Sequence, residues 1–164
     1  MMPSIHVEWQ QAANELDVKG RNLKLAMTGA LKESGKKVKE DFLRPTRTWQ
    51  HRVGVEVLTN ITSTGVELLA GTDDKIYTYL EYGTRPHTIR PKRAKALRFM
   101  SGFRPKTTPG SLWSGAGGSF GDRVYAGAVR HPGTKPRRWL PIIQRRAQKF
   151  TLYSIRKHLE QWAK

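Results

Sequence analysis

The chain has 164 residues, and its 30 Lys and Arg against 13 Asp and Glu give a formal net charge of +17. This length suits a single domain over residues 1–164 that can bury a real core, and 37% hydrophobic residues argue against wholesale disorder. The absence of cysteine excludes disulfide frameworks, thiolate zinc sites, iron–sulfur clusters and cysteine nucleophiles.

The first part of the chain predicts a strand and a long helix. Residues 5–9 alternate apolar and polar side chains, as a short strand does. The N-terminus lacks the basic and apolar regions of a secretion signal, and no stretch approaches the roughly 18 apolar residues of a membrane span. From about residue 16 to 43 the period becomes helical, with room for a break near Gly20, and Arg44-Pro45 ends the helix. The apolar stripe of this helix consists of Leu23, Met27, Leu31, Val38 and Phe42.

The next segment predicts an antiparallel hairpin. Residues 49–59 return to a period of two, which is typical of a strand with one buried face. Residues 60–65 supply turn chemistry, and the apolar run over residues 66–71 forms the second strand. The side chains expected to share one face of the first strand are Val53, Val55 and Val57.

A short helix and a basic turn follow the hairpin. Asp73-Asp74 can cap a helix over residues 75–82, since aspartate side chains accept hydrogen bonds from the first free N–H groups. Residues 83–95 form a basic turn, and residues 96–100 a short strand. The face of the short helix expected to gather its apolar side chains carries Ile76, Tyr79 and Leu80.

The stretch from residue 101 to 122 differs in composition from the rest. Six of its 22 residues are glycine and two are proline. A structureless stretch of this length inside a compact domain is usually functional or disordered. We therefore expect a flexible arm that orders on assembly, or an extended hairpin, inserted in the single domain.

The last segment predicts a strand over residues 124–130 and a helix from about Pro141 to Trp162. The expected fold is α+β, with a small antiparallel β-sheet packed against the long N-terminal helix and the C-terminal helix, and a long Gly-rich arm. On the final helix, one face carries Ile143, Ala147 and Phe150, and another carries Arg145, Lys149 and Arg156.

The positive charge is confined to the second half of the chain. Residues 1–84 contain 11 Lys and Arg and 11 Asp and Glu, whereas residues 85–164 contain 19 and 2. No acidic residue lies between Glu81 and Asp122. This asymmetry indicates an interaction surface for nucleic acid or for acidic protein neighbours, and the alternative is a solvated basic face without a specific partner.

No catalytic or metal site assembles from the sequence. The few acids after residue 84 leave general acid–base chemistry poorly supplied, and the glycine-rich residues 115–119 lack the Lys-Ser/Thr of a phosphate loop. His87 and His131 both lie in proline turns, where we expect hydrogen bonds to the backbone rather than a shared metal. We therefore expect no enzyme, no metal and no cofactor, and a hydrolase that uses either histidine is the weakest alternative. The histidines, which are far apart in the sequence, are His6, His51, His87, His131 and His158.

Two motifs go beyond composition. Residues 79–92 read Y-L-E-Y-G-T-R-P-H-T-I-R-P-K and are followed by A-L-R-F at residues 96–99, and residues 129–140 read V-R-H-P-G-T-K-P-R-R-W-L. Both motifs, in this order and with a variable gap between them, resemble the tail-component family of lambda-like bacteriophages that is named after a gene-ten product. Members of this family are often described as tail-completion or neck proteins. The resemblance covers most of the chain, from Ile5 to about Gln148.

The resemblance implies a non-enzymatic virion structural protein at the head–tail junction of a long-tailed phage. Such a protein is similar to tail terminators, with a small sheet flanked by helices, and forms a homo-oligomeric ring, expected to be a hexamer, that caps the tail tube or joins tail to head. Its implied partners are neighbouring neck and tail-tube proteins and packaged double-stranded DNA, with no membrane. Its implied location is the virion, after assembly in the host cytoplasm.

The candidate site residues lie in and near the two motifs, where Gly and Pro fix rigid turns that either present an interface or only shape the fold. The alternative function is DNA binding by the basic C-terminal half. This binding would be non-specific, because no helix-turn-helix, zinc-finger or RNA-binding signature is present. The candidate subunit or partner interface comprises Tyr82, Gly83, Thr84, Arg85, Pro86, His87, Arg90, Lys92, Arg130, His131, Pro132, Gly133 and Thr134. The candidate contacts to DNA or acidic surfaces are Arg93, Lys95, Arg98, Arg137, Arg138, Arg145 and Lys149.

Overall fold

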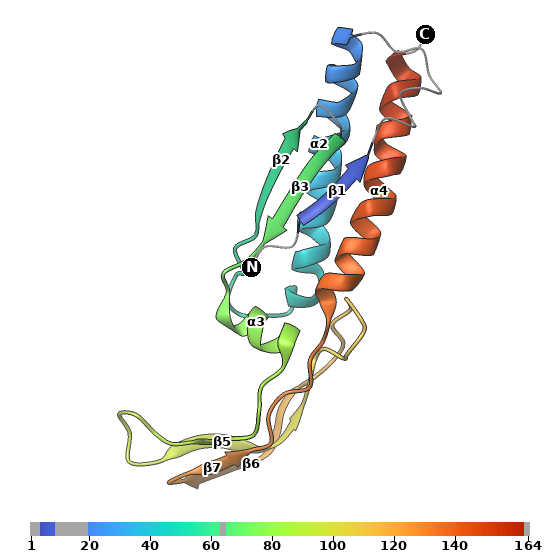
Figure 1. The fold of residues 1–164 in the computed structure, drawn as a ribbon. Helices are drawn as coiled ribbons and strands as arrows, with labels where there is room; N and C mark the ends of the chain where they lie inside the picture. Colours follow the sequence, from blue (N-terminus) through green and yellow to red (C-terminus); the bar gives the residue numbers. More distant parts are fainter. Residues whose placement is uncertain (1–3, 9–19, 63–64, 163–164) are drawn as a thin grey trace. The chain divides into compact units, whose positions relative to one another are not determined.

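The structure, a computed structural model, describes residues 4–8, 20–62 and 65–162. Its helices and small antiparallel sheets confirm the predicted α+β class. The chain divides into two compact units, Met1–Asp73 with Leu140–Lys164, and Asp74–Trp139. The elements in order are β1 (Ser4–Glu8), α2 (Gly20–Leu43), the 3-10 turn η1 (Arg44–Thr46), β2 (Glu56–Ile61), β3 (Gly65–Gly71), α3 (Lys75–Tyr82), β4 (His87–Ile89), β5 (Leu97–Arg104), β6 (Gly118–Ala126), β7 (Val129–His131) and α4 (Trp139–Trp162) (Figure 1).

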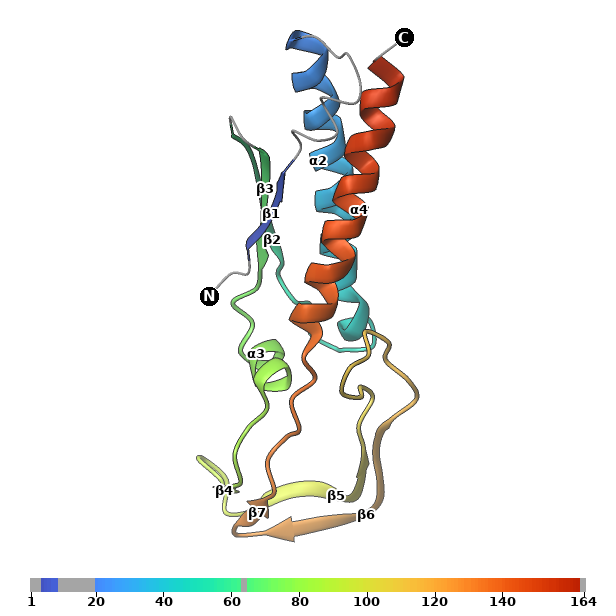
Figure 2. The same cartoon turned by 45° about the vertical axis from the view of Figure 1, so that its right-hand side comes forward.

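The first unit holds a three-stranded antiparallel sheet in the order β1-β3-β2. Figure 2 shows α2 and α4 on the same side of this sheet. β3 alternates between buried and half-buried side chains, with Val66, Leu68 and Ala70 each 1% exposed. The buried side chains of this central strand therefore form the sheet's contribution to the core.

The predicted apolar stripe of the long helix is confirmed. Met27, Leu31, Val38 and Phe42 are buried, and Leu23 is half-buried. Residues 9 and 16–19, and with them the start of the predicted helix, lie outside the described residues. On α4, Ile143 and Ala147 are buried and Phe150 is half-buried, as the helical period predicts, and Pro141 lies in the first turn.

The antiparallel hairpin is confirmed, but its first strand is shorter than the sequence predicts. β2 begins at Glu56, which lies opposite Gly71, the last residue of β3. Residues 49–55 therefore have no further β3 residue to pair with, and the predicted strand over them is wrong. Val53 and Val55 are nevertheless buried, so the alternation in this segment reports burial rather than strand pairing.

The second unit contains α3 and two two-stranded sheets, β4-β7 and β5-β6. Asp74 caps α3 as predicted, because its carboxylate accepts a hydrogen bond from the N–H of Tyr77 at 2.7 Å. The predicted apolar face of this helix is wrong. Ile76 and Tyr79 are 50% and 55% exposed, and Tyr77 and Glu81 are buried instead.

The strands of the second unit also differ from the sequence prediction. β5 extends to Arg104, and the predicted strand over residues 124–130 is two strands, β6 and β7, interrupted between Ala126 and Val129. The two ends of the 101–122 stretch lie in β5 and β6, which pair antiparallel. Between them, Leu112 and Thr107 are buried, so parts of this loop are packed against the rest of the chain.

Candidate assembly interface

The two sequence motifs pair with each other in the second unit. β4, from the first motif, lies antiparallel to β7, from the second, with His87 opposite His131 and Ile89 opposite Val129. An isolated bridge between Thr84 and Thr134 extends this pairing. Two segments that are 40 to 50 residues apart at their paired positions thereby form one surface. We call this surface, residues 82–92 with residues 129–134, the platform.

Two glycines allow the backbones to approach at the Thr84–Thr134 bridge. The N–H of Thr84 donates to the carbonyl of Thr134 at 3.0 Å, and the N–H of Thr134 donates to the carbonyl of Thr84 at 3.1 Å. Gly83 and Gly133 have φ values of 77° and 88°, which side-chain-bearing residues rarely adopt. A Cβ on Gly83 would lie 2.5 Å from the Thr134 carbonyl oxygen, and one on Gly133 would overlap that of Thr84. The two turns therefore lock each other, and only glycine fits either position.

The two histidines of the motifs support the same turns. The carbonyl of Arg85 can only accept, so His87 donates from Nδ1 across the 2.8 Å that separate them. His131 accepts at Nδ1 from the N–H of Gly133 at 3.0 Å, so a neutral His131 carries its proton on Nε2. The ring centroids lie 5.0 Å apart. The predicted hydrogen bonding of both rings to the backbone is confirmed, although these two histidines, distant in the sequence, are neighbours in the structure.

Most side chains of the platform are exposed while its backbone is locked. Tyr82 is 64% exposed, and Gly83, Thr84, His131, Gly133 and Thr134 are half-buried. A fixed backbone that presents exposed side chains suits contact with another molecule, because the backbone has little conformational entropy left to lose on binding. The exposed charged and proline members are Arg85, Pro86, His87, Arg90, Lys92, Arg130 and Pro132.

A buried carboxylate that the sequence does not reveal lies near the end of α3, two residues before Gly83. Glu81 is 4% exposed and accepts a hydrogen bond from the N–H of Trp139 at 2.6 Å. The Tyr77 ring lies 4.9 Å from the Trp139 ring, centroid to centroid. Burial, and then the Glu81 charge, raise the pKa of Tyr77 well above its usual value. Glu81 follows the first motif's Tyr79-Leu80, but its partner is 58 residues away, so only the fold reveals the pair.

Arg137 is not a surface contact, and its prediction as one for DNA or acidic surfaces is wrong. It is 6% exposed, and its guanidinium donates to the hydroxyl of Thr107 at 3.1 Å and to the carbonyl of Lys135 at 3.0 Å. Burial lowers its pKa. The carbonyl of Arg137 also accepts from the N–H of Gly110 at 2.9 Å. The residue therefore ties the 105–117 loop to the end of the second motif.

The remaining candidate cations are exposed but fall in different units. Arg145 and Lys149 lie on α4 in the first unit, so the platform of the second unit does not include them. The exposed cations in the second unit are Arg93, Lys95, Arg98 and Arg138.

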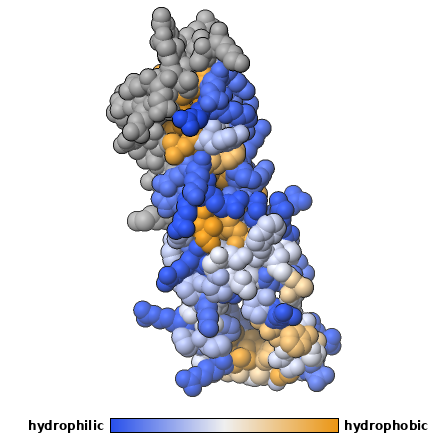
Figure 3. Space-filling model, turned by 90° about the vertical axis from the view of Figure 1, so that its right-hand side faces the viewer, coloured by the Kyte–Doolittle hydropathy of each residue, from blue (hydrophilic) through white to orange (hydrophobic). Residues whose placement is uncertain are grey.

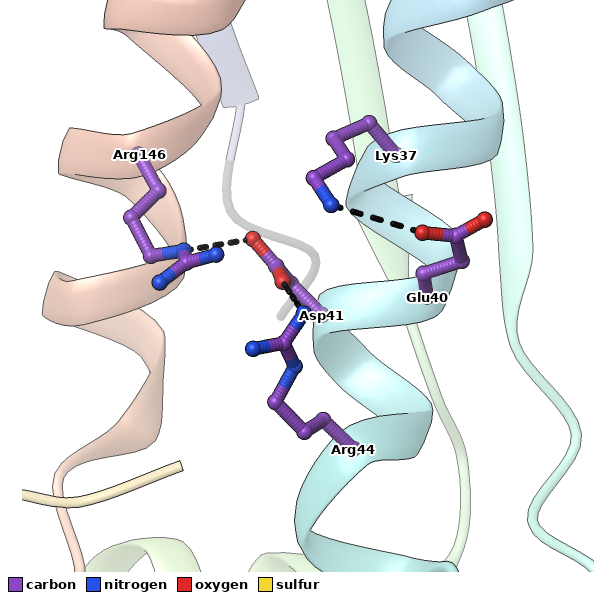
Figure 4. A network of polar contacts seen from close by, with 5 residues as sticks. All are labelled: Lys37, Glu40, Asp41, Arg44 and Arg146. Carbon is purple, nitrogen blue, oxygen red and sulfur yellow. Dashed lines mark hydrogen bonds and ion pairs between the residues drawn. The ribbon is translucent and has the colours of Figure 1, made fainter. Parts of the chain in front are cut away.

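An ion-pair network joins α2 and α4 in the first unit (Figure 4). The carboxylate of Asp41, 3% exposed, meets the Nε of Arg146 at 2.8 Å and a guanidinium nitrogen of Arg44 at 3.5 Å. Beside it lies an open groove of about 320 Å³, lined by Lys37, Asp41, Arg146, Lys149, Phe150 and Tyr153.

A second polar cluster also joins the two helices. Glu33 accepts from the hydroxyl of Ser154 at 2.8 Å and from the Nζ of Lys157 at 3.3 Å, and His158 lies 3.4 Å from it. The Ser154 hydrogen bond is the main cause that lowers the pKa of Glu33, and burial opposes it. These contacts join α2 to α4 at a second point.

The described residues contain neither a metal-binding cluster nor a helix that could span a membrane. Across residues 4–8, 20–62 and 65–162, no three His, Asp or Glu side chains gather where they could hold a metal ion. Within the same ranges, no helix has an apolar window long enough to cross a bilayer.

Comparison with known proteins adds no support to the resemblance of the two motifs. No protein-family model matches the chain, and no curated protein or solved structure is significantly similar to it.

Proposed function

We propose that this chain is a non-enzymatic structural protein of a phage virion, which acts at the head–tail junction as a member of a closed ring. The observation that carries the proposal is the pairing of β4 with β7, because it joins the two motifs on which the resemblance rests. The pairing places the exposed side chains of both motifs on one surface, where they can act together.

The chemistry of the platform favours assembly over catalysis. Its histidines use Nδ1 on their own turns, and its charged side chains are exposed rather than gathered around a cavity. In a ring, each subunit presents the same surface to its neighbour through a heterologous contact that closes by rotation. Exposed arginines on a rigid platform suit the acidic surface of such a neighbour.

The proposal is tested by deleting the gene from a phage that carries it and imaging the lysate. We expect separate heads and tails, and restoration of joined virions by a plasmid copy of the wild-type gene. Normally joined and infectious virions in the deletion lysate would contradict the proposal.

A matched pair of complementing variants locates the interface. Arg85→Glu with Arg130→Glu reverses two exposed charges on the platform, and we expect it to reduce the yield of joined virions by at least tenfold. Lys32→Glu with Lys36→Glu makes the same charge change on the exposed side of α2 and should complement normally. Equal complementation by both pairs would show that the platform is not the interface.

A further inference from the structure

We propose that one face of the β5-β6 hairpin binds double-stranded DNA without sequence specificity. This hairpin face consists of Arg98, Met100 and Arg104 of β5 and Phe120, Arg123 and Tyr125 of β6. The choice of duplex DNA as the occupant rests on the proposed ring at the head–tail junction, for which packaged DNA is an implied partner, and on the observations that follow.

The register of the two strands places these six side chains on one side. Successive residues of a strand point to opposite sides, and residues directly opposite each other share a side. Arg98 lies opposite Tyr125, and Met100 lies opposite Arg123.

The same side continues past a β-bulge. The register shifts between Met100 and Gly102, after which Gly102 lies opposite Phe120. A Cβ on Gly102 would overlap the ring of Phe120, which shows that this ring covers Gly102 on the face that Gly102 shares with Met100. Arg104 then falls two residues further along the same face.

The hairpin face is open to solvent. Tyr125 and Phe120 are 63% and 58% exposed, and Met100 is 37% exposed. The three arginines are exposed as well. Figure 3 shows apolar side chains interspersed with hydrophilic ones over the lower end of the view, where β5 and β6 lie in Figure 1. On the opposite face, Leu97, Val124 and Ala126 are half-buried, whereas Phe99 and Phe103 are 38% and 70% exposed.

The net positive charge of the second unit favours a polyanionic ligand. Residues 74–139 contain 14 Lys and Arg against 3 Asp and Glu. Within the two strands the single acid is Asp122, which falls in the bulge, where its N–H donates to the hydroxyl of Ser101 at 3.0 Å. The hairpin face therefore carries three positive charges and no acidic side chain of its own.

The dimensions and charge of the face suit duplex DNA. Arginine, methionine and aromatic side chains also occur often at protein–protein interfaces, so an acidic protein is the competing occupant that the test must exclude. The major groove, about 12 Å wide, admits a two-stranded ribbon. Arg98 and Arg104 are six residues apart, about 20 Å along a strand, which corresponds to roughly six base pairs. Apolar groups between the arginines can contact thymine methyl groups or sugars.

The test is the salt dependence of binding by the full chain to a labelled 20-base-pair duplex of mixed sequence, followed by fluorescence anisotropy. Each neutralised phosphate contributes about −0.9 to the slope of log affinity against log salt. The variant Arg98→Gln, Arg104→Gln, Arg123→Gln should therefore reduce the slope by about 2.7, and each single variant by about 0.9.

A matched control removes the same charge elsewhere. Lys32→Gln, Lys36→Gln, Lys39→Gln changes three exposed lysines of α2 and should leave the slope nearly unchanged. Circular dichroism should show the same spectrum for both triple variants, and the single arginine variants provide the readout if the triple variant does not fold.

Three outcomes would overturn this proposal. They are an absence of duplex binding at 50 mM salt, an equal loss of slope in the arginine and lysine variants, and tighter binding to polyglutamate of matched charge than to the duplex. Each would leave head–tail joining untouched, because the assay uses purified protein and no virion.

Discussion

Replacing Gly133 with alanine should open the platform that the two motifs form. The new methyl group would overlap the carbonyl oxygen of Thr84, and alanine would have to adopt a φ of 88°. The positive φ costs about 1–2 kcal/mol for a residue with a Cβ. The overlap breaks at least one of the two backbone hydrogen bonds between Thr84 and Thr134, each of which contributes about 0.5–1.5 kcal/mol.

The expected loss in local opening free energy is about 1.5–3.5 kcal/mol, which corresponds to about 10- to 400-fold faster amide hydrogen exchange. Exchange at the Thr84 and Thr134 amides measures this directly. Gly127→Ala is the matched control, because its added Cβ meets no atom within 4 Å and its φ is not positive. Exchange in Gly133→Ala that lies within about threefold of the control would refute the locking of the two turns.

Three further predictions concern buried or half-buried charges. Glu81→Ala should lower the free energy of unfolding by about 1–3 kcal/mol, because it leaves a buried N–H without an acceptor, and Glu81→Gln should cost less; urea titration measures both. Arg146→Ala should cost about 1–2 kcal/mol in the same assay, because it leaves the buried Asp41 carboxylate with one longer ion pair; an unchanged midpoint would show that Arg44 suffices. The lowered pKa of Glu33 stabilises the fold above its unfolded value near 4.5, and this contribution is lost as the pH falls through the folded pKa. Stability measured from pH 6 to 3 should therefore fall less steeply in Glu33→Gln than in wild type, and parallel curves would contradict the assignment.

Local rules predicted the elements that depend on neighbouring residues. The cap of α3 at Asp74 and the hairpin of β2 and β3 follow from capping and turn chemistry within a few positions. The stripe of α2 likewise follows from a period repeated over many residues. The alternation over residues 49–59 predicts a longer β2 than the structure has, because alternation indicates burial, whereas a strand also needs a partner, and β3 ends at Gly71.

The features that could not be predicted depend on distant partners. Glu81 and Trp139 are 58 residues apart, and no pattern within the first motif shows that its glutamate is buried. Arg137 lies in a basic run and reads as a surface cation, yet Thr107, 30 residues earlier, accepts its hydrogen bond in the core. The inward face of α3 was misassigned for the same reason, because Trp139 packs against Tyr77.

The sequence predicts the residues of the candidate interface as members of two separate motifs. It contains no signal that these residues lie on one surface. The pairing of β4 with β7 and the opposed glycines supply that link. In contrast, the hairpin face could not be derived from composition, because the bulge between Met100 and Gly102 decides which aromatic side chains accompany the arginines.

The most direct test of the proposed function is to locate this chain in intact virions by electron cryomicroscopy. We expect a closed ring of the chain at the head–tail junction, with the β4-β7 platform at a boundary between subunits or against a neighbouring neck protein. Finding the chain in the capsid shell or at the distal tail tip, or finding no copy of it in purified virions, would contradict the proposed function.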